Sequence, residues 1–486
     1  MGLSPVPYSI RLPFFWGEAS PAAGVPAAAA QRGLLIGQCT TGDGVVRALG
    51  SADQAAALFG RGSVLHRMAI RAFAACPWGD WSAIGVADAV ASTAAAYTLT
   101  VTVGAAVGGG TIRVWAGSDF VDVGVLASSS PDVSVIATAI AAAFPAGGDY
   151  PVTGTHDAGV ATLTFKCKGN CGNRFNVAID PDVPLPTGVS VAVAQSVQGA
   201  TDPTLTATLA LIQDKAYSKI AVWIDSLGDE QAVDLDAKWA WDKQLYGHAF
   251  TAITGTYTQG DPTGASALYS AALAAPSPYA HWSRLALEAG CRAPAFEGAA
   301  SLCGVALRSD DADPGLTIHG LALLGCKSAP AGKQFTPKQR NDLLYVGYTT
   351  CGDLAGLLAV DRCVTTRFQN AYGSRDERLY KAPKLWLAEW AMKDLRATME
   401  ATYARCRLVS DGGPVPPNCA TPSMVQGTLT SWYEKLCRLG YAQDPDTFAQ
   451  NVKVVRPEQD RDRLDALLPA SLADNFEVFA PVLSFS

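Results

Sequence analysis

The chain has 486 residues, of which 49% are hydrophobic and 17% are charged, and its formal net charge at pH 7 is −7. This length allows two to four domains, and the composition is that of a globular protein rather than a disordered or fibrous one. The negative charge, without any stripe of Lys and Arg, argues against a nucleic-acid-binding surface. The low charge content leaves two explanations open: a protein with much of its surface in contacts, or an ordinary Ala- and Gly-rich soluble protein.

Residues 1–31 are predicted to form an N-terminal arm. The segment is rich in Pro, Ala and Gly and cannot build a core, yet it contains five large apolar residues, namely Ile10, Leu12, Phe14, Phe15 and Trp16. An apolar strand in a loose arm favours addition to the edge of another subunit's sheet. The alternative is that the arm folds back onto its own domain.

No signal or membrane span is predicted. The N-terminus lacks a basic region before an apolar core, so we expect no secretory signal. The most apolar tract, residues 90–107, alternates Thr and Val with Gly and Ser, which is typical of a strand. We therefore expect synthesis and assembly in a cytosol.

Residues 32–91 read as a crossover unit. A buried strand at 34–36 is followed by helices at 52–58 and 63–75, and Ser51 is a suitable N-cap for the first of them. A second strand follows at 81–87. Strand, helices and strand in about fifty residues predict two parallel neighbours in an α/β sheet.

Residues 92–199 read as a β-rich domain inserted into this main domain. The pattern predicts one helix at 132–144 and period-two strands at 97–103, 111–116, 120–125, 160–165 and 189–195. The main domain would then be discontinuous in sequence, with the insertion projecting from it. A carbohydrate-binding module is the functional alternative for such an insertion, although no recognisable site supports it.

The α/β pattern resumes in residues 200–370. It predicts helices at 203–213 and 229–246 and strands at 220–224, 249–254 and 360–368, with further helices and short strands that include 281–289 and 337–346. The fold class is therefore α/β: a discontinuous main domain whose mixed sheet is flanked by helices, with an inserted β-rich domain and extended arms at both ends.

Residues 371–475 are predicted to be a helical C-terminal part of the main domain. The longest predicted helix, 383–407, carries Lys384, Lys393 and Arg396 on a basic side that could face an acidic partner. A merely solvated charged face is the alternative. A helix at 424–439, a strand at 452–455 and a short helix at 461–468 complete this part.

Residues 476–486 are predicted to form a second arm. The apolar residues of a strand pattern, which Pro481 interrupts, are Phe476, Val478, Val482, Leu483 and Phe485. A proline inside a strand belongs at a sheet edge, and a terminal edge strand can leave its own subunit.

Several of these segments resemble one known family. The strings are Gly33 to Gln38, Ala57 to Leu65 with Met68, and Pro77 to Asp88, together with 462–469 and 476–485 at the end of the chain. They are similar, in order, to tail sheath proteins of Mu-like contractile bacteriophages. The resemblance implies a structural subunit in a helical array around a tail tube, which contracts and drives the tube through the host cell envelope.

The resemblance also implies partners and a location. The N-terminal arm would be donated to a neighbouring copy, the β-rich domain would lie on the outer surface, and the basic helix would face the inner tube. Baseplate and tail terminator proteins would be further partners. The protein would reside in the virion after assembly in the host cytoplasm. A phage-derived bacteriocin or a type VI-like secretion system would use a sheath with the same physics.

Enzyme motifs are missing from the sequence. Gly332 and Lys333 are followed by Gln334 instead of the Ser or Thr of a phosphate-binding loop. No nucleophile elbow or zinc-protease helix occurs. The five histidines, at 66, 156, 248, 281 and 319, have no metal-type spacing. We therefore expect no catalytic residues, cofactor or metal, and an α/β enzyme is the least favoured alternative.

Cysteine is unusually frequent. The twelve residues are Cys39, Cys76, Cys167, Cys171, Cys291, Cys303, Cys326, Cys351, Cys363, Cys406, Cys419 and Cys437. Buried apolar thiols are one explanation. The sharper hypothesis is that many of them form disulfides after the particle leaves the reducing cytosol, either within a subunit or between subunits. The pairing cannot be read from sequence.

Overall fold

The computed structural model describes residues 31–42, 44–212, 217–224, 247–257, 268–277, 279–370, 372–458 and 461–482. Two compact units divide them: residues 390–436 and 444–469 form the smaller unit, and the other described residues form the larger one. The five apolar residues of the predicted N-terminal arm and the predicted helix 229–246 lie outside the described residues.

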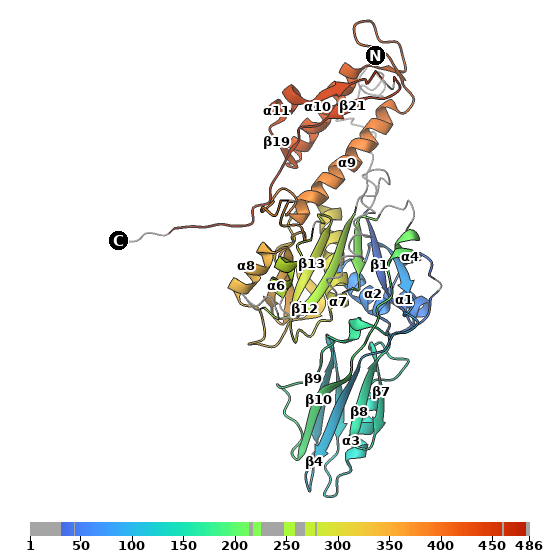
Figure 1. Ribbon diagram of the computed structural model, residues 1–486, viewed down its shortest axis with the longest axis vertical. Helices are drawn as coiled ribbons and strands as arrows, with labels where there is room; N and C mark the ends of the chain where they lie inside the picture. Colours follow the sequence, from blue (N-terminus) through green and yellow to red (C-terminus); the bar gives the residue numbers. More distant parts are fainter. Residues whose placement is uncertain are drawn as a thin grey trace, which may run out of the picture. The chain divides into compact units, whose positions relative to one another are not determined.

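A nine-stranded mixed sheet is the centre of the larger unit, with the strand order β14-β16-β15-β13-β12-β11-β1-β3-β2 (Figure 1). Neighbours from β15 to β3 are parallel, whereas β2, β14 and β16 pair antiparallel. The strands are β1 (Arg32–Gln38), β2 (Arg47–Leu49), β3 (Asp80–Val86), β11 (Lys219–Val222), β12 (His248–Gly255), β13 (Trp282–Glu288), β14 (Ala322–Lys327), β15 (Tyr348–Leu354) and β16 (Leu357–Arg362). The predicted α/β class with a mixed sheet is confirmed.

Helices flank this sheet, and the described ones that lie wholly in the larger unit outside the segment 92–199 are α1 (Ala52–Phe59), α2 (Val64–Ala75), α4 (Thr206–Ala210), α6 (Leu268–Ala274), α7 (Ala295–Ala312) and α8 (Pro337–Tyr345). Ser51 caps α1 as predicted and Ser63 caps α2, because each hydroxyl accepts a hydrogen bond from a backbone N–H in the first turn. The predicted crossover is also correct, since β1 and β3 are parallel neighbours.

Helix α7 was not predicted, although it is the most deeply buried helix of the sheet region. Its sequence, AFEGAASLCGVALRSDDA, places small residues on every side, so it shows no apolar stripe of helical period. At Gly304 an added Cβ would lie 2.7 Å from Cβ of Ala75 and 3.0 Å from the carbonyl oxygen of Ala72. Glycine at this position lets α7 approach α2 closely.

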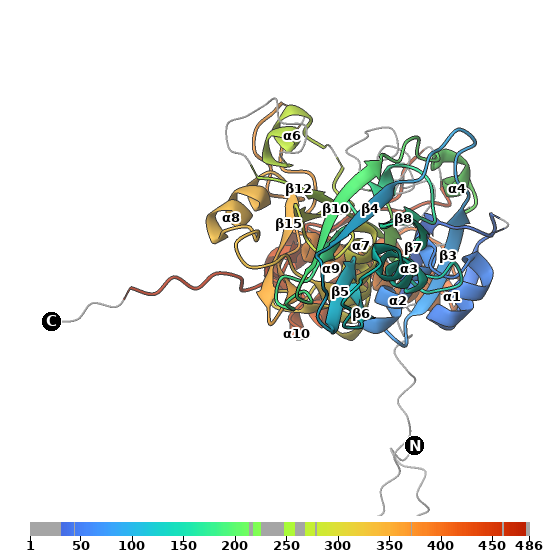
Figure 2. The ribbon, with the colours of Figure 1, turned by 90° about the horizontal axis from the view of Figure 1, so that it is seen from below.

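The segment 92–199 forms two smaller sheets, with the strand orders β10-β4-β8-β7 and β6-β5-β9. The strands are β4 (Ala96–Val103), β5 (Gly110–Ala116), β6 (Asp119–Val125), β7 (Val152–Asp157), β8 (Val160–Phe165), β9 (Val177–Ile179) and β10 (Val189–Val197), with helix α3 (Val133–Ala142) and a 3-10 turn at Asn170–Gly172. The five predicted strands and the helix are present, whereas β7 and β9 were missed. Figure 2 shows these sheets from below.

A buried ion network joins this segment to the helices of the main sheet. Nε of Arg67 and Nε of Arg71, both on α2, lie 2.7 Å from the two carboxylate oxygens of Glu297 on α7. Both guanidinium groups also contact Asp119 at the start of β6, with Arg71 at 3.1 Å. The pKa of Asp119 is lowered, because the two arginines outweigh the effect of burial.

One hydrophobic cluster continues across the same junction. Phe165 of β8 lies with its ring centre 5.3 Å from that of Phe175 and 6.3 Å from that of Phe296 on α7. All three side chains are buried. The segment 92–199 therefore shares its core with the main sheet.

The smaller unit is built on helices. Its elements are α10 (Pro422–Arg438), most of α9 (Ala382–Tyr403), α11 (Pro445–Asn451), β17 (Arg407–Leu408), β18 (Cys419–Ala420), β20 (Lys453–Val455) and β21 (Asp465–Leu467). Nε1 of Trp432 donates to the Asp394 carboxylate at 2.9 Å, and the rings of Tyr433 and Phe448 stack at 3.8 Å. Within the described residues, no helix has the length and apolar character needed to cross a membrane.

Three predicted elements differ from the structure. The helix predicted at 461–468 is wrong, because β21 pairs antiparallel with β20 and Leu467 is exposed, so a helix there would have no apolar face to bury. The helix predicted at 203–213 is limited to α4. The strand predicted at 360–368 begins earlier and ends at Arg362, where the chain leaves the sheet.

The ion network predicts a large effect for Glu297→Gln. The amide cannot neutralise two buried guanidinium groups, so we expect the free energy of unfolding to fall by about 3 to 5 kcal/mol. Chemical denaturation of soluble subunits measures this loss. Asp122→Asn, which removes a surface partner of Arg113, is the control and should leave the free energy of unfolding almost unchanged. Equal stability of the two variants would contradict the prediction.

Candidate functional site

The C-terminal segment leaves the larger unit after a short strand pair. Strand β22 (Ser471–Leu472) pairs antiparallel with β19 (Ala442–Gln443). Residues 473–482 form neither helix nor strand, and Figures 1 and 2 show them running outward as an extended chain. The predicted terminal strand is thus absent from the single chain over these residues, because no neighbouring strand pairs with them. Leu483 and Phe485 lie outside the described residues.

An ordinary surface strand turns its apolar side chains inward and its polar side chains outward, and this segment does the opposite. The inward side is polar: Nδ2 of Asn475 donates to the carbonyl oxygen of Gly315 at 2.9 Å, and Glu477 forms an ion pair with Arg362. The outward side is apolar, with Phe476 81% and Val478 75% exposed. Phe479 and Val482 are also exposed. Folding of the single chain gains nothing from these side chains, so they are available to another molecule.

A second uncovered surface belongs to the smaller unit. Among the residues that the structure describes, strands β20 and β21 pair only with each other and make a two-stranded sheet. Val455 is 59% and Leu467 62% exposed on it. A two-stranded sheet is marginally stable in water and normally needs a third strand or a packed face. This sheet therefore has open edges that an extended apolar segment can complete.

The three basic residues predicted to contact a tube do not gather on one side of α9. Lys384 and Lys393 are nine residues apart, two and a half helical turns, so they project to opposite sides. Nζ of Lys384 lies 3.1 Å from Asp474 of its own chain, and Nε of Arg396 lies 2.8 Å from Glu400. A tube contact through these residues stays a prediction.

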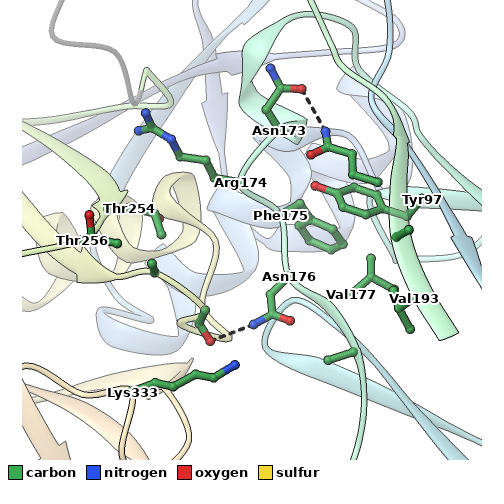
Figure 3. A pocket seen from close by; sticks show the side chains of 16 residues that line it. Tyr97, Asn173, Arg174, Phe175, Asn176, Val177, Val193, Thr254, Thr256 and Lys333 are labelled. Carbon is green, nitrogen blue, oxygen red and sulfur yellow. Dashed lines mark hydrogen bonds between the residues drawn. The ribbon is translucent and has the colours of Figure 1, made fainter. Parts of the chain in front are cut away.

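A cavity of about 490 Å³ opens beside the carboxyl ends of β12 and β13 (Figure 3). Asn176 donates to the carbonyl oxygens of Gly290 and Cys291, and the hydroxyl of Tyr97 donates to the carbonyl oxygen of Gly172. The contacts of Asn176 hold the segment 92–199 against the end of β13, whereas the hydrogen bond of Tyr97 lies within that segment. The described side chains that line the cavity include Lys333 and Tyr97 but no carboxylate and no histidine.

Of the histidines, His248 and His281 lie close to each other, since the backbone N–H of Ala249 donates to the carbonyl oxygen of His281. His248 is buried and its Nε2 lies 2.8 Å from the hydroxyl of Ser283, while burial and the neighbouring Lys219 hold its pKa well below the usual range. His281 pairs with Glu389 at 3.0 Å. Burial lowers the pKa of His66 to about 4. In the described part of the chain, no three His, Cys, Asp or Glu side chains are arranged to hold a metal ion.

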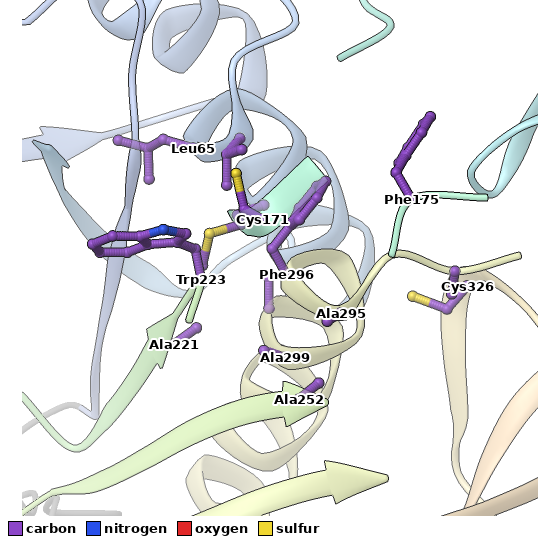
Figure 4. Packing of buried hydrophobic residues seen from close by; sticks show 14 of the residues in the cluster. Leu65, Cys171, Phe175, Ala221, Trp223, Ala252, Ala295, Phe296, Ala299 and Cys326 are labelled. Carbon is purple, nitrogen blue, oxygen red and sulfur yellow. The ribbon is translucent and has the colours of Figure 1, made fainter. Parts of the chain in front are cut away.

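Ten of the twelve cysteines are buried. Figure 4 shows Cys171 and Cys326 among the packed side chains of the core. Burial raises the pKa of Cys167 and Cys326 to about 12 and that of Cys363 to about 11. A buried thiol that stays protonated is a poor nucleophile. Only Cys406 and Cys437 are partly exposed, so oxidation outside the cell stays a prediction that centres on these two.

The comparison with known proteins confirms the resemblance noted in the sequence, and the class concerned is the phage tail sheath proteins. The particular relative is the tail sheath protein of the Mu-like prophage FluMu from Haemophilus influenzae. It is 23% identical over 499 aligned residues, which span 99% of this chain and 98% of the relative. The two sequences therefore correspond from end to end. No protein-family model matches the chain.

Two solved structures complete the comparison. The sheath tail protein of Desulfitobacterium hafniense aligns with a TM-score of 0.48 and 13% identity, over 95% of this chain and 97% of that one. The sheath tail protein of Listeria innocua aligns with a TM-score of 0.47 and 12% identity, over 92% of this chain and 93% of that one.

Thiol accessibility gives a direct prediction. In folded subunits, Cys406 and Cys437 should react with an alkylating reagent first, and the ten buried cysteines more than about tenfold more slowly. Mass spectrometry of tryptic peptides over a time course measures this order. In denaturant all twelve should react alike, which is the control. Uniform labelling of folded protein, or disulfides at the buried cysteines of purified particles, would contradict the expectation.

Proposed function

We propose that the chain is the structural subunit of a contractile phage tail sheath, which polymerises around the tail tube. The observation that carries the proposal is the end-to-end similarity to the FluMu tail sheath protein. Two features of the described residues support it: a terminal segment with exposed apolar side chains, and a two-stranded sheet that no third described strand extends. A protein that works alone has little use for either surface.

Assembly would proceed by exchange of strands between copies. The segment beginning at Phe476 adds to the β20–β21 sheet of another copy, where its backbone finds hydrogen-bond partners and its apolar face covers Val455 and Leu467. Each buried Phe or Val contributes roughly 1.5 to 3 kcal/mol, before the entropy of ordering the segment is subtracted. The N-terminal arm, residues 1–31, would be donated in the same way.

Contraction would change the contacts between compact units while the exchanged strands preserve connectivity. The segment 92–199 would act as a β-rich domain on the outer surface, adding bulk without linking subunits. Rotation of the units would shorten and widen the array, and the arms would serve as tethers during that change. The tail tube, the baseplate and a tail terminator would be the partners, in a virion assembled in the host cytoplasm.

Removal of residues 476–486 tests the donor. Full-length protein should form long hollow tubes visible by negative-stain electron microscopy, whereas the truncated chain should stay as soluble subunits. The physical reason is the loss of every described apolar side chain of the segment. Circular dichroism and thermal melting provide the control, since residues 476–482 form no helix or strand in the single chain. Normal tubes from the truncated chain would overturn the proposed exchange.

Val455→Asp with Leu467→Asp tests the acceptor. Two carboxylates on the open sheet should prevent an apolar strand from adding, because the charges would be desolvated without partners. Tube formation, followed by light scattering, should fall below detection. Leu126→Asp with Val135→Asp makes the same charge change at exposed apolar sites of the segment 92–199 and should leave tube formation intact. Equal behaviour of the two double variants would count against β20–β21 as the acceptor.

A further inference from the structure

The base of the C-terminal segment is held at two points. Nζ of Lys381 and Nζ of Lys384 both lie 3.1 Å from Oδ1 of Asp474. Three residues further along, Glu477 pairs with Arg362, and only 11% of the Glu477 side chain is exposed. Between these ion pairs, the Asn475 amide donates to the carbonyl oxygen of Gly315.

These contacts explain how the segment keeps its reversed orientation. In an extended chain, alternate side chains point to opposite sides. Asn475 and Glu477 are partly covered, while Phe476 and Val478 between them are exposed. Without polar contacts on the inward side, the hydrophobic effect would turn Phe476 and Val478 toward the subunit.

We propose that Arg362, Lys381 and Lys384 are positioning residues, which hold the base of the C-terminal segment so that its apolar face points outward before a second copy binds. This inference rests on the proposed strand exchange and adds the cause of the segment's orientation. Lys384, expected from the sequence to contact a tube, thereby acquires a role within its own subunit.

The two ion pairs differ in exposure, which gives them different sensitivity to salt. The side chain of Asp474 is 55% exposed, whereas that of Glu477 is 11% exposed. Dissolved ions screen exposed pairs more than buried ones. Raising the salt concentration therefore loosens the segment at Asp474 first, while Glu477 still holds.

The test substitutes the basic side and leaves the segment's own sequence unchanged. In the triple variant Arg362→Gln, Lys381→Gln and Lys384→Gln, chymotrypsin should cut full-length soluble subunits after Phe476 about fivefold faster than in the unmodified chain, because a protease needs a freely moving substrate. Cleavage after Tyr372, which is 92% exposed, is the internal reference and should not change. The same variant should assemble into tubes more slowly.

Two further variants separate positioning from general effects of charge or folding. Arg32→Gln, Arg61→Gln and Arg113→Gln remove the same charge from other exposed pairs and should leave cleavage after Phe476 unchanged. The single variant Arg362→Lys retains a cation at this position and should keep most of the unmodified chain's resistance to cleavage after Phe476. An unchanged cleavage rate in the first triple variant would overturn the inference. Faster cleavage, together with normal tubes from the chain lacking residues 476–486, would support the positioning role and refute the strand exchange.

Discussion

The larger unit depends on one buried ion network. Arg67 and Arg71 carry charges that cannot lie unpaired in a core, so α2 must keep both Glu297 of α7 and Asp119 of β6 within reach. The network ties the nine-stranded sheet to the segment 92–199, and the aromatic contacts of Phe165 cover the same junction. In the segment after Leu472, by contrast, Phe476, Val478, Phe479 and Val482 are exposed.

The sequence predicts best where one local rule decides the structure. The first crossover was correct because Ser51 and Ser63 are strong N-caps and the flanking apolar runs are short and unambiguous. Helix α7 was missed because a helix buried on all sides has no polar face, so periodicity carries no signal. The helix expected at 461–468 failed for the opposite reason: its leucines match a helical spacing, but the fold offers them no surface to cover.

In the candidate site too, some features follow from the local sequence and others depend on the tertiary structure. Which residues of the C-terminal segment are apolar can be read directly from the sequence. Their outward orientation cannot, because it depends on Arg362, Lys381 and Gly315, which are between 90 and 160 positions distant from their partners along the chain. The ion pair of Lys384 and the burial of ten thiols likewise depend on the tertiary structure, so no local sequence pattern predicts them.

The donor segment and the acceptor sheet are different surfaces of one chain, and this asymmetry has a geometric consequence. On the proposed exchange, a contact between unlike surfaces gives every filament a polarity. At one end of the filament, the apolar C-terminal segments have no acceptor sheet. At the other end, the β20–β21 sheets have no added strand. The two filament ends then require terminating proteins of different surface chemistry, and growth at one end can be stopped without affecting the other end.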